Sequence, residues 1–135
     1  MTEPVECIVV CDATAPGQAR GFVRSTLNRW NTRCVLAEAE LLLSELVTNS
    51  VVHSGCSQVR VALSSHDETV RLEVVDTNPT TTFQPRVPGP GTEGGFGLRI
   101  LEAVAPRWGF RSDNDTKSVW CELDLPPDRP HALAV

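Results

Sequence analysis

The chain has 135 residues, with 12 basic and 17 acidic side chains that give a formal net charge of −5. A chain of this length hides roughly two-thirds of its unfolded surface in one core, so we expect a single domain over residues 1–135. The acidic balance argues against a direct nucleic-acid partner, because binding to a phosphate backbone depends on clustered Lys and Arg. No apolar run approaches the ~20 residues that cross a bilayer, and no secretory signal opens the sequence, so we expect a cytoplasmic protein without a membrane partner.

The first thirty residues predict a strand followed by a helix. Residues 5–10 are rich in β-branched side chains, which favour a strand. Asp12 or Thr14 can cap the helix, with Pro16 near its first turn. Apolar residues at three- and four-residue spacing extend this helix to about Trp30 and indicate one face packed on a core.

A second helix, predicted over residues 35–53, carries two polar residues in a stretch that is apolar on nearly every side. Such a helix should be buried, and Glu45 and Asn49, four residues apart, should project from one of its faces. Buried carboxylates and amides need partners. This pair suits an activated nucleophile beside a hard cation such as Mg²⁺, which prefers oxygen ligands and usually arrives with phosphates. The helix therefore indicates a nucleotide site.

Two alternating runs, residues 58–63 and 70–76, predict an antiparallel hairpin joined by residues 64–69. Asp76 has the same parity as the apolar residues of its run, so its carboxylate should point to the covered face of the sheet. A carboxylate in that position can recognise a ligand. An aspartate that starts a turn is an equally weighted alternative.

Residues 77–95 are rich in Pro and Gly and favour neither helix nor strand. A loop of this length in a small domain is usually a lid or disordered. Gly94 to Leu101 then leads from flexible glycines into a helix that ends near Pro106. Helix N-termini bind anions, and glycine lets a phosphate approach the backbone, although such a loop is a weak indication by itself.

The last part of the sequence predicts two strands, at residues 108–111 and 118–125, and a tail over residues 126–135. A sheet covered by helices on one face leaves its other face open. That face would carry Arg60, Arg71, Glu73, Trp120 and Glu122. A protein interface and an ordinary amphipathic surface are equally weighted readings of this composition.

The cysteines form an odd set without a Cys-x-x-Cys pair, which favours neither a disulfide framework nor a zinc site. They are Cys7, Cys11, Cys34, Cys56 and Cys121. We expect plain buried thiols.

Three motifs occur in the order found in the Bergerat-fold, histidine kinase-like ATPases. They are Glu45-x-x-x-Asn49, Asp76 at a strand end, and Gly95-Phe-Gly97-Leu98 before a helix. Residues 44–53 and 94–101 most closely resemble the nucleotide motifs of the small bacterial branch that contains the anti-sigma factor serine kinases. The resemblance implies an α+β fold, a two-layer sandwich whose mixed, mostly antiparallel sheet has helices on one face.

The resemblance also implies a site for ATP and Mg²⁺. Asn49 would complete the coordination of Mg²⁺, and Asp76 would accept a hydrogen bond from the adenine amino group. Glu45 would be the general base of phosphotransfer, and residues 77–95 would form the ATP lid. The remaining nucleotide-binding residues implied are Asn78, Gly94, Gly95, Phe96, Gly97, Leu98 and Ser118, the last of these beside the adenine.

One departure from the family pattern concerns the first glycine motif, which usually begins Asp-x-Gly-x-Gly. Here the run from Asp76 contains Asn78 and Pro79 and neither glycine. Asn tolerates positive φ better than most residues, so Asn78 could keep the turn, whereas Pro79 stiffens the base of the lid and removes a donor. Nucleotide affinity and turnover are the properties that this departure affects.

The leading hypothesis is an anti-sigma factor type kinase that binds a sigma factor and phosphorylates an antagonist protein on serine or threonine. The alternative is a binding module with weak or no catalysis, which Pro79 favours. A metabolic enzyme that uses Glu45 as acid or base is a third reading, disfavoured because nothing else supplies a small-substrate site. The resemblance also allows a homodimer.

Overall fold

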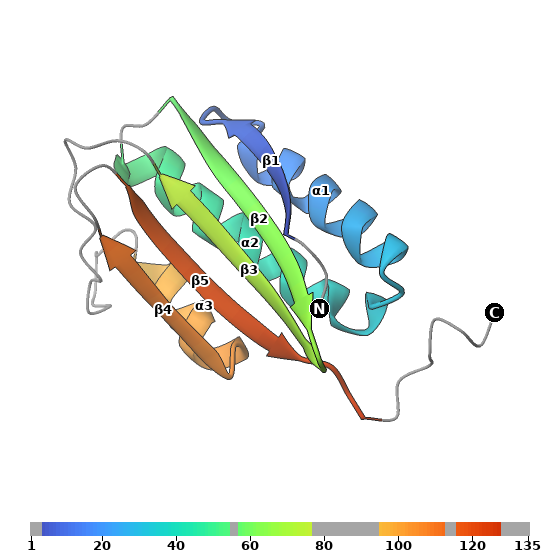
Figure 1. Cartoon of the computed structure of the whole chain (residues 1–135). Coiled ribbons are helices and arrows are strands. Elements are labelled where there is room, and N and C mark those ends of the chain that lie inside the picture. Colours follow the sequence, from blue (N-terminus) through green and yellow to red (C-terminus); the bar gives the residue numbers. More distant parts are fainter. Residues whose placement is uncertain (1–3, 55–56, 77–94, 113–115, 128–135) are drawn as a thin grey trace.

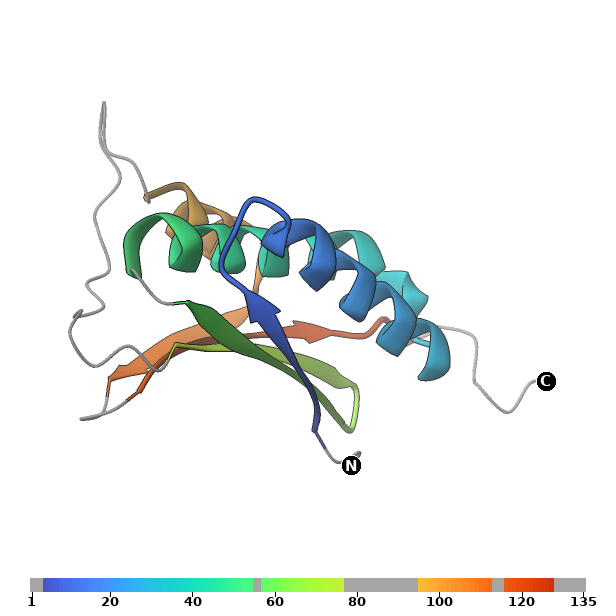
Figure 2. The same cartoon turned by 90° about the horizontal axis from the view of Figure 1, so that it is seen from above.

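The computed structural model describes residues 4–54, 57–76, 95–112 and 116–127. In this part of the chain a sheet forms one layer, and three α-helices cover one of its faces (Figures 1 and 2). This arrangement confirms the α+β, two-layer sandwich. None of the helices described is both long and apolar enough to span a bilayer.

Five strands make up the sheet, in the spatial order β1-β2-β3-β5-β4. Every pairing between them is antiparallel. The strands are β1 (Val5–Val10), β2 (Gln58–His66), β3 (Thr69–Asp76), β4 (Arg107–Ser112) and β5 (Lys117–Asp124). The predicted strand at residues 5–10 is confirmed at both ends, and the turn between β4 and β5 lies outside the described residues.

The β2–β3 hairpin is longer than the sequence predicted. Most of residues 64–69, expected as a loop, continue the two strands, and His66 pairs with Thr69. Only Asp67 and Glu68 remain for the turn. Asp67 adopts a positive φ of 55°, which aspartate tolerates better than most residues. This backbone conformation makes the short turn feasible without glycine.

The first helix, α1 (Ala15–Arg29), has Pro16 in its first turn as predicted. Asp12 does not cap it; its carboxylate instead accepts hydrogen bonds from the Thr14 N–H at 2.8 Å and the Thr14 hydroxyl at 2.5 Å. At the other end, Asn31 has a φ of 56°, and the Thr32 N–H donates to the Leu27 carbonyl at 2.9 Å. That bond, with a left-handed residue before it, is a common way to end a helix.

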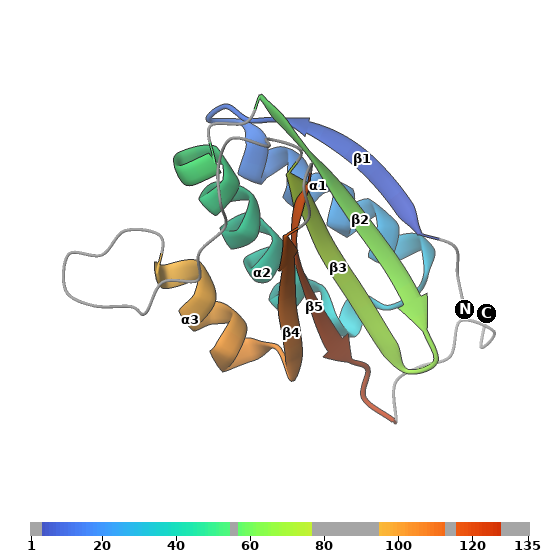
Figure 3. The same ribbon diagram turned by 60° about the vertical axis from the view of Figure 1, so that its left-hand side comes forward.

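The second helix, α2 (Leu36–Asn49), follows a short 3₁₀ turn and continues into a π-helical turn over Ser50–Ser54. It lies over the sheet between α1 and the third helix, α3 (Gly95–Val104) (Figure 3). The expectation that this helix is buried on nearly every side is wrong. Leu41 and Val52 are 43% and 56% exposed, because α1, α3 and the sheet leave the outer side of α2 open.

The hydrophobic core lies between the helices and the covered face of the sheet. Alternate residues of the central strands are fully buried against α1 and α2, which follows from the two-residue period of a strand. The core includes Val23 and Leu27 of α1, Leu42, Leu43 and Val47 of α2, Val59, Val61 and Leu63 of β2, Val70 and Leu72 of β3, and Leu101 of α3. This packing fixes which side chains at the strand ends face the helices.

The cysteines only partly follow the prediction of buried thiols. Cys121 is buried, and desolvation raises its pKa to about 12. Cys7 and Cys11 are half-buried, and burial raises the pKa of Cys7. Cys34 is exposed at the turn between α1 and α2, which corrects the expectation for that residue. Cys56 lies outside the described residues.

Candidate functional site

A buried charge pair joins the ends of β3 and β5 on the covered face of the sheet. Asp76 is 6% exposed and continues the row of Val70, Leu72 and Val74, as its parity predicted. Lys117 pairs with Asp76 in the strand register and is also 6% exposed. Its Nζ lies 3.7 Å from Asp76 Oδ2.

Sequence reasoning missed Lys117, although one signal could have found it. Val119, Cys121 and Leu123 alternate along β5 with their side chains toward the core, and one step back along this alternation is Lys117. A buried ammonium is costly unless an opposite charge accompanies it, and Asp76 supplies that charge.

Ser118, predicted to lie near the adenine, follows Lys117 in β5 and faces the other side of the sheet from Asp76. It pairs with Val75 in the register and shares its face with Trp120, on the open side of the sheet. Because successive side chains of a strand point to opposite faces, Lys117 and Ser118 cannot both face the helices. The residue at the end of β5 that faces the same side as Asp76 is therefore Lys117.

Glu45 and Asn49 are half-buried near the C-terminal end of α2. Glu40 pairs with Arg24 of α1, and at about 100° per residue Asn49 lies on the opposite side of the helix from Glu40. Glu45 and Asn49 therefore lie on the flank turned away from α1, toward α3. Neither side chain has a hydrogen bond or ion pair within the described part of the chain.

The side-chain oxygen atoms of Glu45 and Asn49 are better suited to a nucleotide-bound Mg²⁺ than to a metal ion held by protein ligands alone. No group of three or more His, Cys, Asp or Glu side chains in the described ranges could hold a metal ion. Mg²⁺ typically uses one or two protein oxygens together with phosphates and water. The amide oxygen of Asn49, half-buried beside a π-helical turn, suits that role, and π-helical turns are frequent at functional sites.

The C-terminal end of α2, the end of β3 and the first turn of α3 lie toward the same end of the domain (Figures 1 and 3). Gly95, Phe96, Gly97 and Leu98 form that first turn, and only their backbone is described. A helix N-terminus presents unpaired N–H groups that bind anions. The topology thus brings the end of α2 with Asn49, the end of β3 with Asp76 and the N-terminus of α3 to one end of the domain, from three distant parts of the sequence.

Two of the predicted nucleotide-binding residues cannot be placed. Asn78 and Gly94 lie outside the described residues, as does the expected lid up to Gly94. Most of the expected tail also lies outside them.

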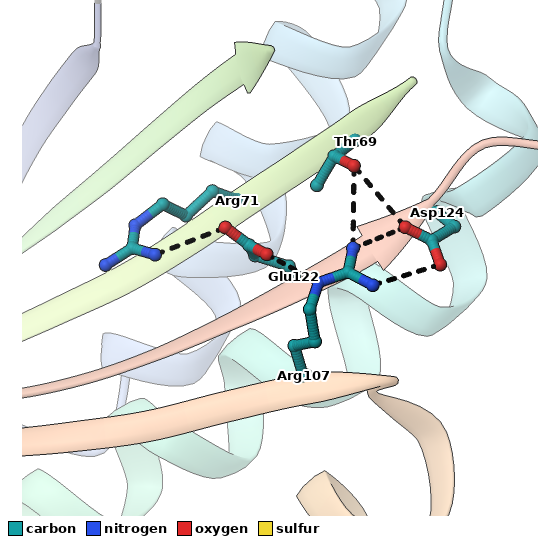
Figure 4. A network of polar contacts seen from close by, with 5 residues as sticks. All are labelled: Thr69, Arg71, Arg107, Glu122 and Asp124. Carbon is teal, nitrogen blue, oxygen red and sulfur yellow. Dashed lines mark hydrogen bonds and ion pairs between the residues drawn. The ribbon is translucent and has the colours of Figure 1, made fainter. Parts of the chain in front are cut away.

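A second cluster of charges lies on the open face of the sheet and links β3, β4 and β5 (Figure 4). Glu122 accepts hydrogen bonds from Arg107 Nε at 2.7 Å and Arg71 at 3.3 Å. Arg107 also contacts Asp124. The Arg107 guanidinium lowers the pKa of both carboxyls, with Arg71 adding to the effect at Glu122.

Trp120 lies on the same open face and is held from two sides. The Arg71 guanidinium stacks over its ring, 4.3 Å from the ring centre. A Cβ added to Gly109 would lie only 2.8–2.9 Å from three indole atoms, so glycine is required beneath the ring. The predicted composition of this face is therefore confirmed, and its tryptophan is half-buried and packed rather than freely exposed.

The sequence matches the family described as "Histidine kinase-like ATPase domain" over residues 11–122. The chain belongs to this family. The match spans Glu45, Asn49, Asp76 and the first turn of α3, and membership of the family implies ATP binding.

A solved structure has a similar fold, and an uncharacterized protein is similar over part of the sequence. The fold is similar to that of the RsbU and RsbW domains of Rv1364c from Mycobacterium tuberculosis, with a TM-score of 0.71, 20% sequence identity and 96% of this chain covered. The chain spans 34% of the length of that structure's chain. It is also 35% identical over 86 residues to SCO4941, an uncharacterized protein of Streptomyces coelicolor, covering 59% of this chain and 79% of that protein. The family match over residues 11–122 confirms the resemblance to the histidine kinase-like ATPases.

Proposed function

We propose that this histidine kinase-like ATPase domain is an ATP-binding regulator of the anti-sigma factor type. It binds a sigma factor and phosphorylates an antagonist protein on serine or threonine. The observation that carries the proposal is the half-buried pair of Glu45 and Asn49, which has no partner in the described part of the chain and lies at the same end as Asp76 and the start of α3. The similarity in fold to a structure that contains an RsbW domain supports it.

Each residue has one role in the proposed reaction. Asp76 accepts a hydrogen bond from the adenine amino group, Asn49 gives its amide oxygen to the nucleotide-bound Mg²⁺, and the backbone N–H groups at Gly95 and Gly97 hold phosphate oxygens. Glu45 takes the proton from a partner's serine or threonine hydroxyl as that oxygen attacks the γ-phosphorus and the bond to ADP breaks. Mg²⁺, when bound, neutralises charge on the phosphates.

The partners follow from this role. A sigma factor and its antagonist are both proteins, which agrees with the net charge of −5 and with the absence of a composition suited to nucleic acid. We place the protein in the cytoplasm, where sigma factors act. A homodimer is compatible with the two edge strands, β1 and β4, at the rims of the sheet.

The test compares Glu45→Gln with wild type in two assays. Calorimetry with Mg²⁺-ADP should give similar affinities, because Glu45 acts on the attacking hydroxyl and not on the nucleotide. Transfer of ³²P from labelled ATP to antagonist proteins of the source organism should fall at least a hundredfold. Glu38→Gln, two turns earlier on the same flank, is the matched control and should retain transfer. Equal transfer by wild type and Glu45→Gln would refute the catalytic role.

The alternative is a nucleotide-dependent binding module with weak or no catalysis. Asn78 and Thr80 replace the glycines of the usual motif, and Pro79 lies between them. They favour this alternative, because proline removes a donor and stiffens the chain after Asp76. ADP binding without phosphotransfer to any antagonist would support this module. If calorimetry detects no nucleotide at all, only a scaffold function remains.

A further inference from the structure

Lys117 is the only lysine of the chain, and the fold buries it beside the one carboxylate on the covered side of β3. The other core-facing positions of β5 are apolar, namely Val119, Cys121 and Leu123. An apolar side chain at position 117 would continue that row without a desolvation penalty, whereas an ammonium adds one. A purely space-filling role therefore does not explain the choice of lysine.

The distance between the two charges is informative. Lys117 Nζ and Asp76 Oδ2 are 3.7 Å apart, which is longer than the about 2.7–3.2 Å of a direct N–H···O hydrogen bond. The two groups balance each other's charge without a direct hydrogen bond between these two atoms. A donor and an acceptor thus lie side by side at the end of the sheet where the site residues gather.

We propose that Lys117 and Asp76 read the base together and that Lys117 extends the site from adenine to guanine nucleotides. The proposal rests on the proposed nucleotide site. Adenine carries an amino group at position 6, a donor that suits the carboxylate of Asp76. Guanine carries a carbonyl oxygen there, an acceptor that Asp76 alone would repel and that the Lys117 ammonium satisfies.

The chemistry of the two side chains makes this reading specific. Lysine offers three donors and no acceptor, and contacts of Arg or Lys with the O6 and N7 of guanine are the commonest specific base contacts in the major groove of DNA. The N1–H of guanine, next to O6, is a donor that can reach Asp76 at the same time. Inosine shares both of these groups and lacks the 2-amino group of guanine, so it isolates the contribution of position 6.

The first experiment measures wild-type affinities for ADP, GDP and IDP by calorimetry. We expect the three dissociation constants to agree within about tenfold. Lys117→Met, of similar length and without charge, should weaken GDP and IDP at least tenfold, as expected for a lost charge-assisted hydrogen bond, and should change ADP less than about threefold. Circular dichroism establishes that the variant is folded at the temperature of the titration.

The second experiment needs no variant. Because the chain has a single lysine, protein labelled with ζ-¹⁵N-lysine has one side-chain nitrogen signal. That signal should move on addition of GDP or IDP and to a different position on addition of ADP. For the first experiment, Arg60, exposed on the open face, supplies the control substitution Arg60→Met, which should leave all three affinities unchanged.

Four outcomes would overturn the proposal, and they are distinguishable. If no nucleotide binds, both the proposed function and this inference are refuted. If ADP binds with more than hundredfold discrimination against GDP and IDP, only the inference is refuted. Binding of all three with an unmoved lysine signal, or an unchanged selectivity in a folded Lys117→Met protein, would also refute the inference alone, since Lys117 would then only balance the charge of Asp76.

Discussion

Replacing Asp76 by asparagine tests whether the buried charge pair determines stability as well as ligand binding. The substitution keeps the size of the side chain and removes its charge, which takes away the carboxylate beside the Lys117 ammonium at 6% exposure. Removing one member of a buried ion pair typically costs about 3–5 kcal/mol, because the other charge stays desolvated. Lys117 and Asp76 are separated by 3.7 Å, so we place the loss at the lower end, about 3 kcal/mol.

A second substitution separates the charge from the fold. Lys117→Met in the Asp76→Asn background removes the ammonium as well, and neutral replacements of buried ion pairs are often as stable as the pair. The double variant should therefore recover most of the loss, while nucleotide binding, which needs the carboxylate, should stay lost. Adding Lys117→Met to Asp76→Asn should thus restore stability but not nucleotide binding.

Urea unfolding monitored by circular dichroism measures both effects. The Asp76→Asn midpoint should fall with an unchanged slope, and the melting temperature should drop by about 10–15 °C for a domain of this size. The coupling energy from the four proteins, wild type, the two single variants and the double variant, gives the interaction directly. Equal stability of Asp76→Asn and wild type, or a double variant less stable than Asp76→Asn, would refute the reasoning.

Other predictions concern the open face and the thiols. Gly109→Ala places a methyl group against the Trp120 indole and should cost about 1–3 kcal/mol in urea unfolding, whereas the same change in a Trp120→Ala background should be nearly neutral. The pKa of Glu122 in the folded state lies below its ordinary value of 4.5, so the unfolded chain takes up the proton first as the pH falls, and stability is lost below about pH 4.5. Arg107→Met should flatten that loss between pH 5 and 3, and an unchanged profile would contradict the cause given for the shift. Cys34 should react rapidly with Ellman's reagent in the native protein, and Cys34→Ser should remove this fast phase.

Local patterns in the sequence predicted most of the elements. The strand at residues 5–10, the helices and the second strand of the hairpin follow from periodicity and from the residues at their ends. The prediction of a loop over residues 64–69 was wrong. Asp67 adopts a positive φ, so a short turn forms there without glycine and the strands continue to His66 and Thr69. Turn length depends on such single dihedral angles, which composition does not reveal.

The candidate site was also only partly predictable from the sequence, because the pairing between strands determines which side chains face the helices. The parity of Asp76 in its own strand sufficed to turn its carboxylate inward, because every second side chain of β3 is buried. For β5 the family pattern suggested Ser118, and the register assigned the inward position to Lys117 instead. A shift of one residue exchanges the two faces of a strand, so only the pairing settles which residue faces the helices.

By itself the sequence determined the α+β architecture, the family, and the residue types suited to a nucleotide, since these depend on periodicity and on short motifs. The tertiary structure alone decided that α2 keeps one side open and that the only lysine faces Asp76. It also decided that Trp120 lies flat over Gly109 under a stacked arginine. Those outcomes depend on contacts between segments far apart in the chain, which no local pattern encodes.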